Sequence, residues 1–139
     1  MKNDIPSVKL RSVKKLDCEF LYDLLKERDP RANISHKKMP SFAQHVKFVM
    51  SKPYSKWYVI EALKNDVGSI YLTKNNEIGI SFKKDFHNSA IASNAIKLLM
   101  KKHPRSRYFA NMNPKNKKLI QFFKNQKFQL LQHTYELEK

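Results

Sequence analysis

The sequence is short of the two residues on which many binding and redox motifs depend, because its 139 residues include only two glycines and one cysteine. None of the familiar glycine-containing motifs of nucleophilic or Walker-type phosphate sites occurs. Cys18 has no partner for a disulfide within the chain, and its place beside Phe20 and Leu21 in a helical pattern predicts a buried, unreactive thiol. An oxidising compartment is not indicated.

Long apolar runs are also missing. No stretch approaches the roughly 20 apolar residues of a membrane-spanning helix, and the polar first residues do not resemble a signal peptide. The histidines show no paired i, i+4 spacing and have no cysteine pair beside them, so no metal site is predicted. They are His36, His45, His87, His103 and His133. We expect a soluble, cytoplasmic protein.

Acidic residues are scarce: 12 Asp and Glu stand against 28 Lys and Arg, for a formal net charge of +16. Such a charge attracts polyanions or phosphate-rich ligands. The basic residues are spread along the chain rather than gathered in a block, so a bias in composition is an equal explanation. The length and the 41% share of hydrophobic residues predict one globular domain, residues 1–139, with a single core.

The first fifty residues predict one strand and two helices. Residues 8–13 alternate as a strand, and Asp17 is placed to cap a helix that ends at residues 28–30. Ser41 and Gln44 have the spacing of a capping box that opens a second helix. Between the helices, residues 31–40 are predicted to form a loop that either covers a ligand or is simply solvated. The apolar residues expected to face inward are Phe20, Leu21, Leu24 and Leu25 in the first helix and Phe42, Val46, Val49 and Met50 in the second.

A run of three strands follows. Residues 57–61, 67–73 and 77–82 are separated by polar turns at 64–66 and 75–76, which is typical of an antiparallel meander. In the third strand, Ile78, Ile80 and Phe82 alternate with polar or small residues, so that one face is apolar.

The third strand leads directly into a helix. An amphipathic pattern over residues 91–99 predicts a helix that is capped by Asn88 and ends at residues 103–104. The first N–H groups of a helix lack intrahelical partners and carry the positive end of its dipole, which suits a phosphate. An ordinary capped turn is the alternative.

Residues 107–112 then predict another strand. Asn113 and Pro114 would open a helix, with a proline at its first position, and residues 129–137 would form the last strand. The residues of this helix expected to face inward are Leu119, Phe122 and Phe123. The order of elements predicts an α/β fold, a mixed sheet flanked by helices.

This order of elements resembles the GNAT family of acyl-CoA-dependent N-acetyltransferases over nearly the whole chain. After the fourth strand, that family has Arg or Gln, two residues, Gly, one residue, and Gly or Ala. The matching residues here are His87, Asn88, Ser89, Ala90, Ile91 and Ala92. Ala92 fits this pattern, whereas His87 and Ala90 depart from it.

A later element of the family, an Asn followed by an aromatic residue and then Gly-Phe, matches Asn116, Phe123 and Phe128. Phe123 stands where Tyr is common, and Lys127 replaces the Gly. The resemblance implies a mixed, centrally antiparallel sheet flanked by about four helices. It also implies transfer of an acetyl group from acetyl-CoA to a primary amine, without a metal.

Cofactor-binding positions are carried over from the resemblance. They are Ile80, Phe82, His87, Asn88, Ser89, Ala90, Ile91, Ala92, Asn116 and Phe123. Backbone N–H groups near Ile80 would hold the thioester oxygen, and Asn116 would bond to the pantetheine arm. The methyl group of Ala90 stands where glycine lets the pyrophosphate approach, which predicts weaker cofactor binding.

Glu77 is the candidate general base, directly or through a water, because the resemblance puts the start of its strand beside the acyl group. An exposed carboxylate at a strand edge is the alternative. Phe123 has no proton to give, so Tyr108, Tyr135 or water would have to protonate the leaving thiolate.

Substrate contacts implied by the resemblance are His36, Trp57 and Tyr58, which look like the branch that acetylates small amines, including amino groups on nucleotide-linked sugars. Sheet packing is the alternative for Trp57 and Tyr58, and a surface position for His36. A protein or peptide amine is also open as the acceptor, and so is the choice between monomer and homodimer.

A second function is a GNAT-like module that has lost catalysis through Ala90 and Phe123 and binds nucleic acid or another polyanion through its basic surface. Nucleic acid is not an expected partner of the enzyme. Strong salt dependence of binding would distinguish the module from a cofactor pocket.

Overall fold

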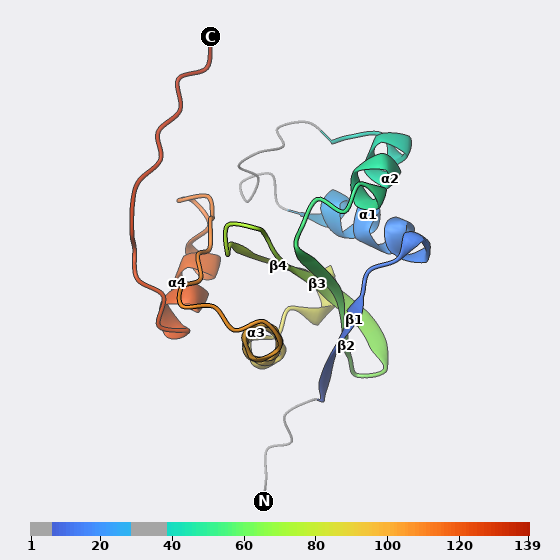
Figure 1. Ribbon diagram of the computed structural model, residues 1–139, viewed down its shortest axis with the longest axis horizontal. Coiled ribbons are helices and arrows are strands. Elements are labelled where there is room, and N and C mark those ends of the chain that lie inside the picture. The colour runs from blue at the N-terminus through green and yellow to red at the C-terminus, as the bar shows by residue number, and fades with distance from the viewer. Residues whose placement is uncertain (1–6, 29–38) are drawn as a thin grey trace, which may run out of the picture.

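A four-stranded antiparallel sheet forms the centre of the protein (Figure 1). The computed structural model describes residues 7–28 and 39–139. The strands are β1 (Val8–Ser12), β2 (Lys56–Ala62), β3 (Asn65–Leu72) and β4 (Ile78–Phe82), and they lie in the order β1-β2-β3-β4. The predicted meander is therefore confirmed, and β1 joins its outer side by pairing with β2.

The β2–β3 turn is tighter than the predicted turn at residues 64–66. Only Leu63 and Lys64 lie between the strands, with φ angles of 53° and 61°. Two consecutive residues with positive φ are the mark of a two-residue hairpin loop that matches the twist of the strands. Asn65 and Asp66 accordingly belong to β3.

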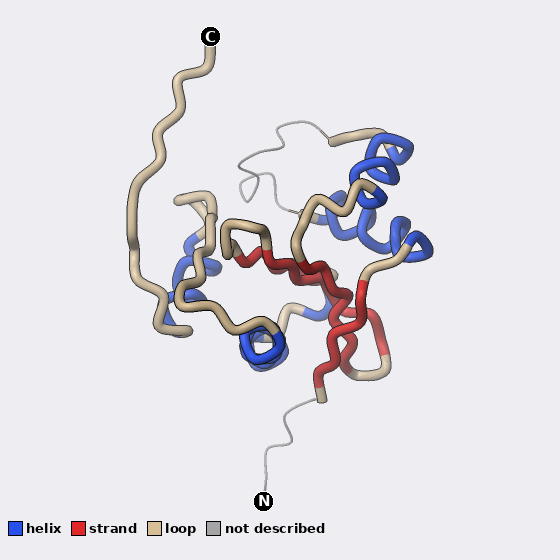
Figure 2. Tube along the Cα trace, in the orientation of Figure 1, coloured by secondary structure: helices blue, strands red, loops and turns tan. Residues whose placement is uncertain are grey.

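One face of the sheet is covered by α3 (Ser89–Lys102), and we refer to it as the α3 face (Figure 2). Apolar side chains from this face, from α3 and from α4 (Lys117–Asn125) build the main core. The largest fully buried side chains among them are Ile60, Ile70, Leu72, Ile91, Ile96 and Leu99. The alternation of Ile78, Ile80 and Phe82 in β4 contributes to this core as predicted.

The opposite face lies toward α1 (Cys18–Glu27) and α2 (Phe42–Met50), and we refer to it as the α1/α2 face. Cys18, Leu21, Leu24 and Val49 form a second, smaller cluster there, with Trp57 of β2 packed against it. The buried position predicted for the Cys18 thiol is confirmed. Four helices flank the sheet in the described parts of the chain, together with short 3-10 turns at Lys15–Asp17 and Lys84–Phe86.

The start of α1 differs from the prediction, whereas the start of α2 agrees with it. Asp17 precedes α1 but does not cap it, because its carboxylate accepts bonds from the Lys14 N–H and from Arg11. The capping box of α2 is present as predicted, with bonds in both directions between Ser41 and Gln44.

The inward face of α2 agrees only in part with the prediction. Val49 is buried and Val46 packs against the second cluster, as predicted. Phe42 and Met50 are exposed instead, and His45 is buried. The predicted loop at residues 31–40 lies mostly outside the described residues.

The chain after α3 is less regular than predicted. Residues 107–112 contribute one bridge, a parallel pairing of Phe109 with Glu77, rather than a strand. Asn113 and Pro114 form a turn, and α4 begins at Lys117 with Asn116 as its N-cap. Residues 129–137 form no strand, and Figure 1 shows this last segment extending away from the sheet. A strand needs continuous pairing along an edge as well as a suitable local pattern. Residues 107–112 meet the outer edge of the sheet at this single bridge.

Candidate active site

The outer edge of β4 opens where it meets residues 107–112. The Ile78 N–H donates to the Phe109 carbonyl at 2.7 Å, and the Phe109 N–H donates to the Asn76 carbonyl at 2.9 Å. Glu77, which precedes β4, forms a parallel bridge with Phe109, and this is the one bridge between the two segments in the described chain. Beyond Ile78, the two segments part.

Ile80 lies just past this point of separation. Successive residues of a strand point their backbone groups to opposite sides, and the Lys83 N–H and Glu77 carbonyl both bond to the β3 side. The N–H and carbonyl of Ile80 therefore face away from β3, toward the opening. Its N–H is therefore a backbone donor directed away from the sheet, and the role in holding a thioester oxygen that the resemblance implied stays a prediction.

Glu77 is held firmly beside the bridge. Its Oε1 accepts from the Thr73 hydroxyl at 3.0 Å, and its Oε2 accepts from the Asn111 amide at 2.5 Å. Its own N–H donates to the same threonine oxygen at 3.1 Å. The carboxylate is thus oriented on the α1/α2 face, at the same edge as the opening. Its role as a base stays a prediction.

The start of α3 follows β4 directly, but Asn88 already occupies part of it. The Asn88 Oδ1 accepts from the N–H groups of Ala90 and Ile91, at 2.8 and 3.2 Å. The predicted N-cap is confirmed. The side chains of Ile91 and Ala92 are buried, so these residues can offer only backbone groups to a ligand. A phosphate here would meet Ser89 and His87 first, or would displace the Asn88 side chain.

Lys83 and Lys84 precede this helix and are tied to α1. The Lys83 ammonium contacts the Glu27 carboxylate at 2.5 Å, and the Lys84 N–H donates to the other oxygen of Glu27 at 2.9 Å. This pairing lowers the pKa of Glu27 and raises that of Lys83. It joins the α1/α2 face to the segment that leads from β4 into α3.

Predicted cofactor residues in α4 have structural partners. The Asn116 Oδ1 accepts from the Leu119 N–H at 3.2 Å, so the carbonyl end of its amide serves as a helix cap. Phe123 is buried and meets Phe122 and Phe128 edge to face, with ring centroids 5.4 and 5.0 Å away. Ile80 and Phe82 pack against the same core.

The predicted substrate residues divide between the two faces. Tyr58 is in the core on the α3 face, where its hydroxyl lies 2.6 Å from the His103 Nε2 and burial raises its pKa. Trp57 is on the α1/α2 face and donates its indole N–H to the Ser69 hydroxyl at 2.7 Å. His36 lies outside the described residues.

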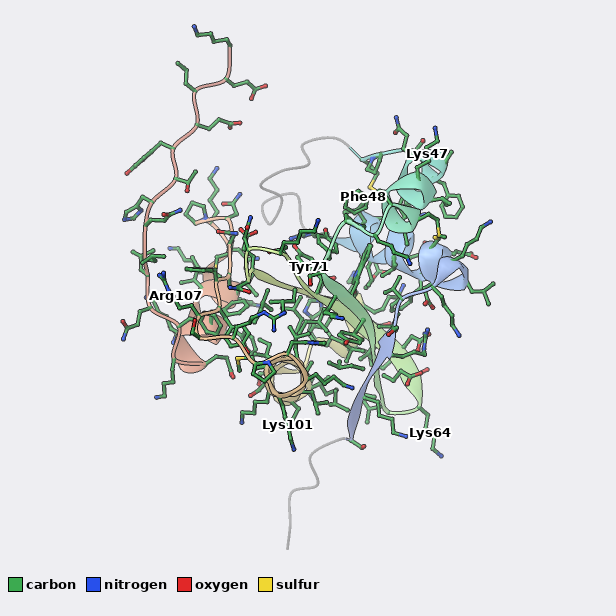
Figure 3. All side chains as sticks on the ribbon, in the orientation of Figure 1. Lys47, Phe48, Lys64, Tyr71, Lys101 and Arg107 are labelled. Carbon is green, nitrogen blue, oxygen red and sulfur yellow. The ribbon has the colours of Figure 1, made fainter. Side chains whose placement is uncertain are left out.

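The sequence analysis missed an aromatic wall on the α1/α2 face, formed by Tyr54, Trp57 and Tyr71. Tyr71 pairs across the sheet with Trp57 on one side and Gly79 on the other. Tyr54 stacks flat on Tyr71, with centroids 3.8 Å apart, and meets Trp57 edge to face at 4.8 Å. Figure 3 shows Tyr71 on the side of the sheet away from Lys101 of α3. Only the register of the strands reveals this grouping.

The three residues of the wall are half-buried. Burial raises the pKa of the Tyr54 hydroxyl, with a further contribution from its hydrogen bond to Tyr71, while the nearby Arg28 lowers it. Tyr54 therefore stays protonated over the physiological range. Of the residues proposed earlier as acids, Tyr108 bonds to the His103 carbonyl, and Tyr135 is 90% exposed on the last segment.

No group of His, Cys, Asp and Glu suited to a metal ion occurs among the residues that the structure describes. Within the same ranges, no helix is both long and apolar enough to cross a bilayer.

Solved structures with the same fold are numerous. A domain from Methanocaldococcus jannaschii is similar at a TM-score of 0.78 and 19% identity, over 94% of both chains. An acetyltransferase from Thermus thermophilus is similar at a TM-score of 0.71 and 14% identity, over 91% of this chain and 90% of that one. RimL, a ribosomal L7/L12 alpha-N-protein acetyltransferase in complex with coenzyme A, has a TM-score of 0.68 and 16% identity, over 86% and 78%.

These similarities establish that the chain has the fold of GNAT N-acetyltransferases, as the sequence resemblance implied. No protein-family model matches the sequence, and no curated protein matches it either.

Proposed function

We propose that the protein is an acyl-CoA-dependent N-acetyltransferase that transfers an acetyl group to a primary amine. The observation that carries the proposal is the end of backbone pairing beside β4, just after the bridge between Glu77 and Phe109. The Ile80 N–H is directed to this side of the strand, in a chain with the fold of known acetyltransferases. An N–H group in a gap between two strands can hold a carbonyl oxygen as negative charge develops on it.

In the proposed reaction, the nitrogen of the acceptor attacks the thioester carbonyl carbon, a C–N bond forms and the C–S bond breaks. The nitrogen loses one proton and the thiolate of CoA gains one. Glu77, oriented by Thr73 and Asn111, would take the proton directly or through a water. Water would supply the proton to the thiolate, since Phe123 has none and Tyr108 is committed elsewhere.

The cofactor would lie along the opening, with its phosphates toward the start of α3. Its recognition there rests on the backbone of Ser89 and His87 and on the Asn88 side chain. Because Asn88 satisfies two N–H groups of the first turn and Ala90 adds a methyl group, we expect weak affinity for the pyrophosphate.

The acceptor we favour carries negative charge near its amine, as a nucleotide-linked amino sugar does. Structural neighbours act on different amines: RimL on a protein α-amine, and the similar SpeG of Vibrio cholerae on spermidine and spermine. A chain with a net charge of +16 repels a polycation such as spermidine and attracts a phosphate-bearing amine.

Thermal unfolding with acetyl-CoA is the first test. Ligand at 100 times its dissociation constant stabilises the folded state by about 2.7 kcal/mol, which raises Tm by several degrees. ATP serves as the matched polyphosphate. An equal shift with ATP, or no shift with acetyl-CoA, would reject the proposal and turn attention to polyanion binding.

Acceptor classes are then compared by CoA release with a nucleoside-diphosphate amino sugar, spermidine and a short peptide with a free α-amine. We expect turnover with the first. Glu77→Gln should lower kcat while the acetyl-CoA shift in Tm persists. Unchanged kcat would remove Glu77 from the mechanism.

A further inference from the structure

Tyr71 occupies space that only a glycine in β4 leaves open. A Cβ atom added to Gly79 would lie 2.0 Å from Cζ and 2.3 Å from the hydroxyl oxygen of Tyr71. The phenol end of the side chain therefore rests directly on the backbone of β4. Covering a strand glycine with an aromatic ring stabilises a sheet, which is a purely structural use of this contact.

The position of the Tyr71 ring is also fixed by its aromatic neighbours. Tyr54 stacks on it with an interplanar angle of 4°, and Trp57, which holds Tyr54 edge to face, is itself anchored on the Ser69 hydroxyl. The oxygen on such a ring is held in place, so it can accept a hydrogen bond without a large cost in entropy.

The hydroxyl is close to the proposed reaction centre. The Cβ position of Gly79 is three covalent bonds from the Ile80 nitrogen, so the Tyr71 oxygen lies within about 7 Å of that nitrogen. A thioester oxygen held by the Ile80 N–H would bring its carbonyl carbon near the Tyr71 hydroxyl. Tyr71 and Glu77 share the α1/α2 face, so both face an amine arriving from that side.

We propose that the Tyr71 hydroxyl accepts a hydrogen bond from the attacking amine and directs its lone pair at the thioester carbonyl, an inference that rests on the proposed function. The amine N–H donates to the phenol oxygen, while the proton lost after attack goes to Glu77 or water. Gly79 is required because any side chain there would push the phenol away from the reacting atoms.

Tyr71→Phe separates this role from sheet packing, because it keeps the ring over Gly79 and removes only the oxygen. The probe is hydroxylamine, a small nucleophile that needs no specificity pocket. The readout is CoA release above the rate without protein, because hydroxylamine also cleaves thioesters unaided. We expect kcat/KM for hydroxylamine to fall about 3- to 10-fold, the value of one hydrogen bond. KM for acetyl-CoA and its shift in Tm should not change.

Tyr22→Phe is the matched control. It also removes one tyrosine hydroxyl, but one on α1 that donates to the Pro40 carbonyl, so it should leave turnover unchanged. Gly79→Ala should reduce kcat/KM at least as much as Tyr71→Phe does, and the double variant should be no worse than the more damaging single one.

Unchanged kcat/KM in Tyr71→Phe, or an equal fall in Tyr22→Phe, would overturn the inference while leaving the proposed function intact. If the unmodified protein neither releases CoA with hydroxylamine nor gains stability from acetyl-CoA, the proposed function itself fails and the role of Tyr71 falls with it.

Discussion

The two faces of the sheet are built from different chemistry. On the α3 face, β2, β3 and β4 present Tyr58, Ile70 and Ile80 in one row, and Ile70 is fully buried. On the α1/α2 face, the neighbouring row presents Trp57, Tyr71 and Gly79, with Glu77 and Ser69 close by. Because adjacent residues of one strand serve opposite faces, the α3 face can supply stability while the other face carries polar and aromatic groups.

The largest expected effect is on the α3 face. Ile70→Ala removes a fully buried side chain from the main core and should lower the free energy of unfolding by about 2–5 kcal/mol. Ser69→Ala, one residue away on the other face, leaves the Trp57 N–H without its partner and should cost about 1–3 kcal/mol. Urea unfolding of both variants measures the contrast, and equal losses would contradict it.

An ion cluster on the α1/α2 face gives the next effect. The Arg11 guanidinium bonds to both oxygens of the buried Asp17, at 3.1 and 3.0 Å, and its pKa is raised by this contact. Asp17→Asn should cost about 1.5–3 kcal/mol of unfolding free energy. Asp66→Asn is the control, since Asp66 is 40% exposed at 3.2 Å from the same Arg11, and it should cost less than about 1 kcal/mol.

Each face also contains one histidine that resists protonation. Burial lowers the pKa of His45 on α2 and, with nearby cations, that of His103 at the end of α3. The unfolded chain binds these protons near pH 6.5, whereas the folded chain binds them only at lower pH, so stability falls as the pH drops below that value.

The free energy of unfolding should change with pH by at most about 1.4 kcal/mol per pH unit for each histidine. Measurements of Tm at pH 7.5 and pH 5 in His45→Gln and His103→Gln would show how much of the fall in stability at low pH comes from each histidine. His45 is expected to dominate, because its buried Nε2 has no hydrogen-bond partner in the described parts of the chain. A Tm that is independent of pH would contradict both assignments.

The smallest effect is a gain, at the turn that ends α4. Lys127 has a φ of 74°, a conformation that costs a side chain energy and that glycine adopts freely. Lys127→Gly should raise the free energy of unfolding by about 0.5–1 kcal/mol in thermal unfolding. A loss of stability would show that the lysine makes a compensating contact.

Local patterns were sufficient where a structure depends on neighbours in sequence. The capping box at Ser41 and the cap at Asn88 were predicted from spacing, and so was the apolar alternation of β4. The start of α4 was misplaced because both Asn113 and Asn116 have the chemistry of a cap, and the bond to Leu119 decides in favour of Asn116.

Features that depend on distant partners could not be predicted in this way. The strands expected at residues 107–112 and 129–137 have suitable alternation, but pairing at an edge is set by the tertiary fold. At the site, the contact of Tyr71 with Gly79 was invisible because it depends on the register between β3 and β4. The roles of Glu77, Ile80, Asn116 and Phe123 remain predictions.

The indole of Trp57 makes the α1/α2 face optically distinct. It is the chain's single tryptophan, and its ring edge meets Tyr54 while its N–H bonds to Ser69. Its fluorescence therefore reports on that face alone, and the nearby tyrosines can transfer excitation to it. A molecule that settles against the aromatic wall would change the wavelength or intensity of this emission, so occupancy of one face could be followed by light without attaching a label.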